Sequence, residues 1–159
     1  MAERLKAAGA EVLVISSIGG HFCIDAFRPV SPLPVLDMID AMNAHMAKAG
    51  HRRVGLLGTD TVMATRFYGG LAGVDVLIPP EDKIPGLHRA YADMAISGQV
   101  TPETREAFFT AGREMATRGA EVVLLGGTDL FLAFDGDDPG FPVLDCALVH
   151  VDAILEAAA

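Results

Sequence analysis

Two short segments of the chain, residues 58–61 and 126–129, carry glycine, threonine and aspartate in the same order. Each segment follows an apolar run and precedes a stretch with a helical pattern. Glycine lets backbone N–H groups approach a ligand closely, and the hydroxyls of Thr59 and Thr128 can donate hydrogen bonds to a carboxylate or phosphate. A second interpretation stays open for both segments, in which the Thr-Asp pairs cap the helices that follow.

A third candidate segment, Ser17-Ile18-Gly19-Gly20-His21, follows the apolar run at residues 12–15. A histidine beside a Gly-Gly loop can act as an acid or a base, because its ordinary pKa is about 6.5. The alternative is a loop histidine that is bonded to backbone or water. Ser17 has no GxSxG motif around it, so the sequence assigns no Ser-His-Asp set.

The two cysteines, Cys23 and Cys146, are expected to be free thiols. Cys23 lies in the apolar stretch FCIDAF and is predicted to be a core residue. Cys146 begins the last helix, where a helix N-terminus favours a thiolate, but burial against the sheet is the preferred interpretation. No histidine, cysteine or carboxylate spacing is typical of a zinc or EF-hand site, and we expect no metal.

The composition disfavours several classes of protein. The 12 Lys and Arg against 21 Asp and Glu give a net charge of -9, which repels a nucleic-acid backbone. No apolar run approaches the roughly 20 residues that cross a bilayer, and the first residues lack the apolar region of a signal peptide. No GxGxxG or GxxxxGK[ST] motif occurs. We therefore expect a soluble, cytoplasmic protein that binds no nucleic acid, no membrane and no cofactor.

The candidate segments must be positioned by an alternation of short apolar strands with helices. Glycine, threonine and proline mark the expected helix ends. Strands are expected at residues 12–15, 54–58, 74–78, 121–127 and 142–144, and helices at 2–9, 35–49, 84–97 and 102–118 and from 59, 128 and 145. This order predicts an α/β fold with a parallel sheet and flanking helices, in which ligands bind at the carboxyl ends of strands.

Four segments of the chain together resemble the cofactor-independent aspartate/glutamate racemase family. They are VGLLGTDTVMATRFYGG, the stretch from VLIPPEDK to TPETREAF, RGAEVVLLGGTDLFLAF and PVLDCALVHVDAI. The resemblance implies two pseudo-symmetric α/β lobes with the substrate between them. It implies that residues 1–52 and 141–159 form an incomplete first lobe, and that residues 53–140 form the second.

In the family that the chain resembles, two cysteines face the substrate from opposite sides and carry the transferred proton. Ser17 stands where the resemblance places the first cysteine, Gly127 where it places the second, and Asp129 where it places a glutamate. Racemisation by two thiols is therefore chemically unavailable, and other proton transfer of isomerase or lyase type is expected to fall to Ser17, His21, Asp60 or Asp129. The expected binding residues for a small carboxylate or amino-acid-like ligand are Gly58, Thr59, Thr61, Lys83, Gly127 and Thr128.

Two further expectations come from the resemblance. Because it begins partway through the first lobe, the strand at residues 12–15 is expected to leave an edge that a homodimer or a partner subunit covers. An incomplete gene product is the alternative explanation. The alternative function is a non-catalytic homologue that acts as a binding or partner subunit.

Overall fold

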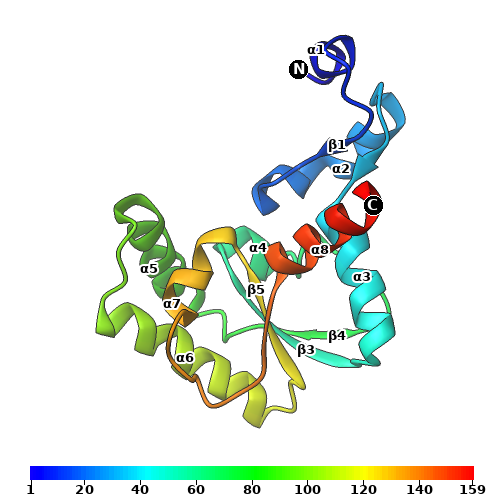
Figure 1. Ribbon diagram of the computed structural model, residues 1–159. Coiled ribbons are helices and arrows are strands. Elements are labelled where there is room, and N and C mark those ends of the chain that lie inside the picture. The colour runs from blue at the N-terminus through cyan, green and yellow to red at the C-terminus, as the bar shows by residue number, and fades with distance from the viewer.

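A four-stranded parallel sheet forms the centre of the computed structural model, which describes residues 1–159. Figure 1 shows this sheet with helices on both of its faces. The strand order is β4 (Asp75–Leu77), β3 (Arg53–Gly58), β5 (Val122–Gly126) and β6 (Val143–Asp145). The predicted α/β class with a parallel sheet and flanking helices is confirmed.

Each face of the sheet packs against its own group of helices. Leu57 and Leu125 contact the layer formed by α5 (Ile84–Ser97), α6 (Pro102–Thr117) and α7 (Phe131–Phe134). Leu56 and Leu124 point to the layer formed by α3 (Met38–Ala49) and α8 (Cys146–Ala158). Because successive side chains of a strand point to opposite faces, the continuous apolar runs of β3 and β5 supply both cores.

Helix boundaries follow the capping residues of the sequence. Thr101 accepts a hydrogen bond from the N–H of Thr104 at 3.1 Å, and α6 begins at the next residue. The helices α3 and α5 end at Gly50 and Gly98, whose φ angles of 75° and 65° suit glycine. The helix expected from residue 35 begins later, because Asp37 is the N-cap of α3. The other short helices are α1 (Ala2–Ala7), η1 (Ile18–Cys23), α2 (Ile24–Phe27), η2 (Arg28–Val30), α4 (Asp60–Ala64) and η3 (Thr128–Leu130).

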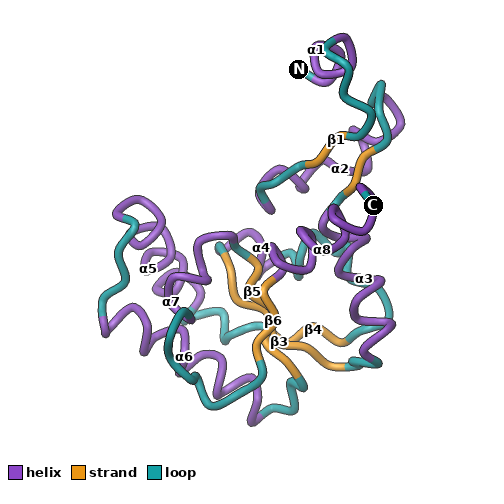
Figure 2. Tube along the Cα trace, viewed as in Figure 1, coloured by secondary structure: helices purple, strands orange, loops and turns teal.

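The N-terminal segment forms a second, smaller sheet that lies apart from the first (Figure 2). Its two parallel strands are β1 (Leu13–Val14) and β2 (Val35–Leu36). The continuous apolar run at residues 12–15 predicts a parallel strand that is covered on both faces. This prediction is wrong, because Val12 and Val14 are 43% and 37% exposed. These side chains line an open hollow of about 430 Å³ beside the end of α8.

The segment from residue 143 onward contacts both parts of the chain. β6 pairs with β5 through Val143 opposite Val123, so residues 143–145 lie in the larger sheet. α8 then leaves this sheet and packs along α3. His150 of α8 donates from Nε2 to the carbonyl oxygen of Leu36 at 3.2 Å, which joins α8 to β2. The division of the chain into two lobes stays a prediction.

His21 is buried where the N-terminal segment meets α3 and α8. Its Nδ1–H donates to the carbonyl oxygen of Ser17, its Nε2 accepts from the N–H of Met38, and both distances are 3.0 Å. The His150 ring lies edge-on to it, with centroids 6.2 Å apart. Burial lowers the pKa of His21, with the hydrogen bond to Ser17 opposing the shift and the nearby His150 adding to it. The neutral ring is therefore the form that the fold requires.

We predict that acid destabilises the protein through His21. As the pH falls below 6.5, the unfolded chain binds a proton at this residue while the folded protein does not. The free energy of unfolding therefore decreases with falling pH until the lowered pKa of the folded protein is reached. Urea unfolding at about pH 7.5 and about pH 5.5 measures this fall, at most about 1.4 kcal/mol per pH unit for one group. His21→Gln should reduce the pH dependence, whereas His45→Gln on α3 should not. An unchanged dependence in His21→Gln would contradict this prediction.

Candidate functional site

Both Gly-Thr-Asp loops leave the sheet at the same edge, since β3 and β5 end side by side with Gly58 opposite Gly126. A Cβ atom at Gly58 would lie 2.6 Å from the carbonyl oxygen of Gly126, and one at Gly126 would lie 2.8 Å from the carbonyl oxygen of Leu57. Only glycine allows the two strand ends to approach this closely. The loops are thereby brought together, as expected for a ligand site at the carboxyl ends of parallel strands.

The two threonines of the loops have different roles in the fold. Thr59 is the N-cap of α4, and its Oγ1 accepts from the N–H of Val62 at 3.3 Å. Thr128 makes no capping hydrogen bond through its side chain. The capping interpretation therefore holds for Thr59 alone, and the half-buried Thr128 keeps its hydroxyl free. Thr61 is exposed, and its hydroxyl donates to Asp60 at 3.2 Å.

Helix α5 reaches both loops with side chains one turn apart. The N–H of Asp60 donates to Nδ1 of His88 at 3.2 Å, and the hydroxyl of Tyr91 donates to Oδ2 of Asp129 at 2.9 Å. Burial raises the pKa of Tyr91 to about 12, and the hydrogen bond to Asp129 adds to the shift. Neither residue is predicted from the sequence. The i, i+3 spacing on a predicted helix was the only signal for them.

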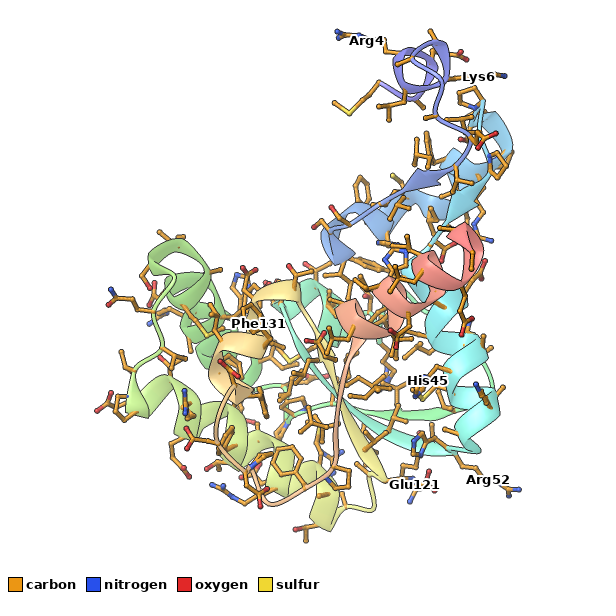
Figure 3. The ribbon with its side chains drawn as sticks, viewed as in Figure 1. Arg4, Lys6, His45, Arg52, Glu121 and Phe131 are labelled. Atoms are coloured by element: carbon orange, nitrogen blue, oxygen red, sulfur yellow. The ribbon has the colours of Figure 1, made fainter.

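A hollow of about 580 Å³ opens beside Thr128, between α7 and the start of α8. Apolar side chains form most of its wall, including Phe131 and Leu148, which are 48% and 63% exposed. Figure 3 shows Phe131 far from Arg52 and Glu121, which lie where β3 and β5 begin. The hollow therefore belongs to the same end of the sheet as the two loops.

No lysine or arginine forms an ion pair or hydrogen bond with either loop. Lys83 precedes α5 and pairs with Glu114 of α6 at 2.6 Å, where it lines a hollow between these helices. Arg4 and Lys6 project from α1, far from the larger sheet (Figure 3). An anion at the loops would thus depend on hydroxyl and N–H donors.

Ser17 and His21 take no part in the contacts between α5 and the two Gly-Thr-Asp loops. Ser17 is exposed and precedes η1, and its carbonyl oxygen is the acceptor for His21. Both ring nitrogens of His21 are bonded to backbone groups, the arrangement that the sequence left open as the alternative to an acid-base role. No hydrogen bond joins Ser17 or His21 to Asp60 or Asp129.

The two cysteines differ in burial. The prediction that Cys23 lies in the core is wrong, because its side chain is exposed. The 3₁₀-helix η1 directs every third residue inward, namely Ile18 and His21, with Ile24 following, so Cys23 faces outward. The predicted burial of Cys146 is confirmed, and burial raises the pKa of its thiol.

No group of three or more His, Cys, Asp or Glu side chains is arranged to hold a metal ion. None of the helices combines the length and apolar character needed to cross a membrane.

Residues 1–154 match the family model described as Asp/Glu/Hydantoin racemase. A candidate Asp/Glu racemase from Yersinia pestis is similar in structure, with a TM-score of 0.89, 28% identity, and coverage of 99% of this chain and 70% of that one. An aspartate racemase homologue from Pyrococcus horikoshii has a TM-score of 0.83 and 29% identity over the same shares. Picrophilus torridus aspartate racemase shares the fold, with a TM-score of 0.75, 20% identity, and coverage of 99% of this chain and 66% of that one. The parallel sheet, its paired Gly-Thr-Asp loops and these matches together show that the chain belongs to the Asp/Glu/hydantoin racemase family.

Proposed function

We propose that the protein binds a small carboxylate or amino-acid-like ligand at the carboxyl ends of β3 and β5, and that it does so in the cytoplasm. The observation that carries this proposal is the free hydroxyl of Thr128 beside a hollow of about 580 Å³. A carboxylate bonded to Thr128 and to neighbouring N–H groups would leave the rest of the ligand in this hollow. The other residues of the proposed site are Gly58, Thr59, Thr61 and Gly127. Lys83 can contact the ligand only if its ion pair with Glu114 breaks.

The proposed chemistry is proton transfer of isomerase or lyase type without two thiols. Ser17 carries a hydroxyl at the position of the first family cysteine, and Gly127 carries nothing at the second. A serine hydroxyl is a poor base without an activating partner. Of the proposed acid-base groups, Asp129 accepts a hydrogen bond from the buried Tyr91. His21 would first have to release the N–H of Met38.

The second candidate function is a non-catalytic binding or partner subunit. One observation favours it: both nitrogens of His21 are bonded to backbone groups, so the ring stabilises the fold without a free basic site. A binding protein needs the Thr128 hollow but neither Ser17 nor His21 as a proton carrier. Exchange of a proton of any bound carboxylate with deuterated water would favour the first candidate function, whereas the absence of exchange with aspartate or glutamate is expected under both.

We predict that the protein does not racemise aspartate or glutamate. In deuterated water, the α-proton of either enantiomer should remain unexchanged at enzymatic rates, because Gly127 cannot carry a proton. Proton NMR measures the loss of the α-proton signal. Prompt exchange with both enantiomers would contradict the proposed loss of two-thiol chemistry.

We predict that succinate and aspartate stabilise the folded protein. A ligand at about 100 times its Kd adds about 2.7 kcal/mol, which raises the melting temperature by several degrees in a chain of this size. Thr128→Val should reduce this shift and barely change the unliganded melting temperature, since Thr128 caps no helix.

Thr59→Val is the matched control for this experiment, because Thr59 does cap a helix. It should lower the unliganded stability by about 0.5–2 kcal/mol. If neither ligand shifts the melting temperature of the wild-type protein, the proposed carboxylate site does not exist.

We also propose that the protein is a homodimer or binds a partner subunit through the open side of β1. Val12 and Val14 expose apolar surface there, and Val151 and Leu155 do so on α8. Sedimentation at micromolar concentration should show a dimer that Val14→Lys dissociates, because a charge blocks an open strand edge. Ile96→Lys, on the exposed surface of α5, is the control and should not dissociate it. A wild-type monomer would contradict self-association.

A further inference from the structure

The space in front of Gly127 is occupied by the side chain of Tyr91. A Cβ atom added to Gly127 would lie 2.7 Å from Cε2, 2.9 Å from the hydroxyl oxygen and 3.0 Å from Cζ of that ring. The backbone of Gly127 is extended, with φ of -169° and ψ of 128°, and any residue adopts this conformation. A side chain at residue 127 would therefore require the Tyr91 ring to shift.

The phenol places a polar group close to the position that the side chain of residue 127 would occupy. Its oxygen lies 2.9 Å from the Cβ position of residue 127. The ring is 9% exposed, and its hydroxyl is fixed by the 2.9 Å hydrogen bond to Asp129. Asp129 is half-buried, so the carboxylate is the more exposed member of this pair.

We propose that the hydroxyl of Tyr91, held by Asp129, is the group that contacts the ligand where residue 127 has no side chain. This inference rests on the proposed carboxylate site and names one more residue of it. Tyr91 lies on α5, whereas Thr128 and Asp129 lie in the segment that follows β5. Two different elements thus complete one edge of the site.

The pair recognises a ligand group that donates hydrogen bonds. Because the phenol gives its proton to Asp129, its oxygen presents lone pairs to a ligand, and the carboxylate has a second oxygen free. The raised pKa of Tyr91, about 12, keeps the phenol neutral at physiological pH. An ammonium group satisfies both acceptors, so aspartate should bind better than succinate, which differs from it only by lacking this group.

The first test needs no ligand. Gly127→Ala should lower the melting temperature by about 3–10 °C, because overpacking of this kind costs about 1–3 kcal/mol. The same change in a Tyr91→Ala background should cost much less. Gly86→Ala is the matched control, since Gly86 lies on α5 with nothing within 4 Å of its Cβ position, and it should not destabilise the protein. If Gly127→Ala is as stable as the wild type, Tyr91 does not occupy this space and the inference is overturned.

The second test uses the fluorescence of Tyr91. The chain has no tryptophan and two tyrosines, so Tyr68→Phe makes Tyr91 the only emitting residue. Aspartate should change this emission more than succinate does. Tyr91→Phe keeps the ring beside Gly127 but removes the hydroxyl, and it should lose at least about half of the aspartate-induced melting shift while keeping most of the succinate-induced shift.

The outcomes separate this inference from the proposed function. If wild-type protein responds to both ligands but Tyr91→Phe keeps the full aspartate preference, Tyr91 only fills space, and the carboxylate site stands without it. Equal responses to aspartate and succinate in the wild type likewise overturn the contact with the ammonium group. If neither ligand shifts the wild-type melting temperature, the carboxylate site and the inference fail together.

Discussion

Backbone hydrogen bonds between β3 and β5 run from Val54 opposite Val122 to Gly58 opposite Gly126, and this register determines the geometry of the site. Because the two strands are parallel and end at the same level, the loops that follow them must emerge together. The same pairing lets alternate side chains of the two strands fill the cores on both faces of the sheet. The close approach of the strand ends then restricts residues 58 and 126 to glycine.

Side chains of helix α5 form hydrogen bonds with polar groups of both loops. Its apolar side chains Leu87 and Met94 pack in the core, while His88 and Tyr91 reach Asp60 and Asp129. The position of the loop side chains thus depends on a helix that lies elsewhere in the sequence. This dependence gives the loops a fixed conformation even though their own helices, α4 and η3, are short.

The sequence predicts those parts of the fold in which a local signal and the tertiary structure agree. Continuous apolar runs identified β3 and β5, and Thr101 and Gly98 marked helix ends, because these signals act within a few residues. The errors at Cys23 and at residues 12–15 have another cause: an apolar stretch does not reveal which neighbours cover it. Part of the candidate site was predictable from the Gly-Thr-Asp order. Tyr91 was not, since its contact with Asp129 forms only when α5 packs against η3.

The contact between Tyr91 and Gly127 also constrains how this sequence can evolve. A side chain gained at residue 127 while Tyr91 remains overpacks the core, and a smaller residue at position 91 leaves a cavity and an unpaired Asp129. Each single substitution is costly, whereas the two together compensate for one another in volume. The positions are therefore reciprocally epistatic. A lineage that carries this pair therefore pays a cost in stability for any single substitution that places a side chain at residue 127, however simple the codon change.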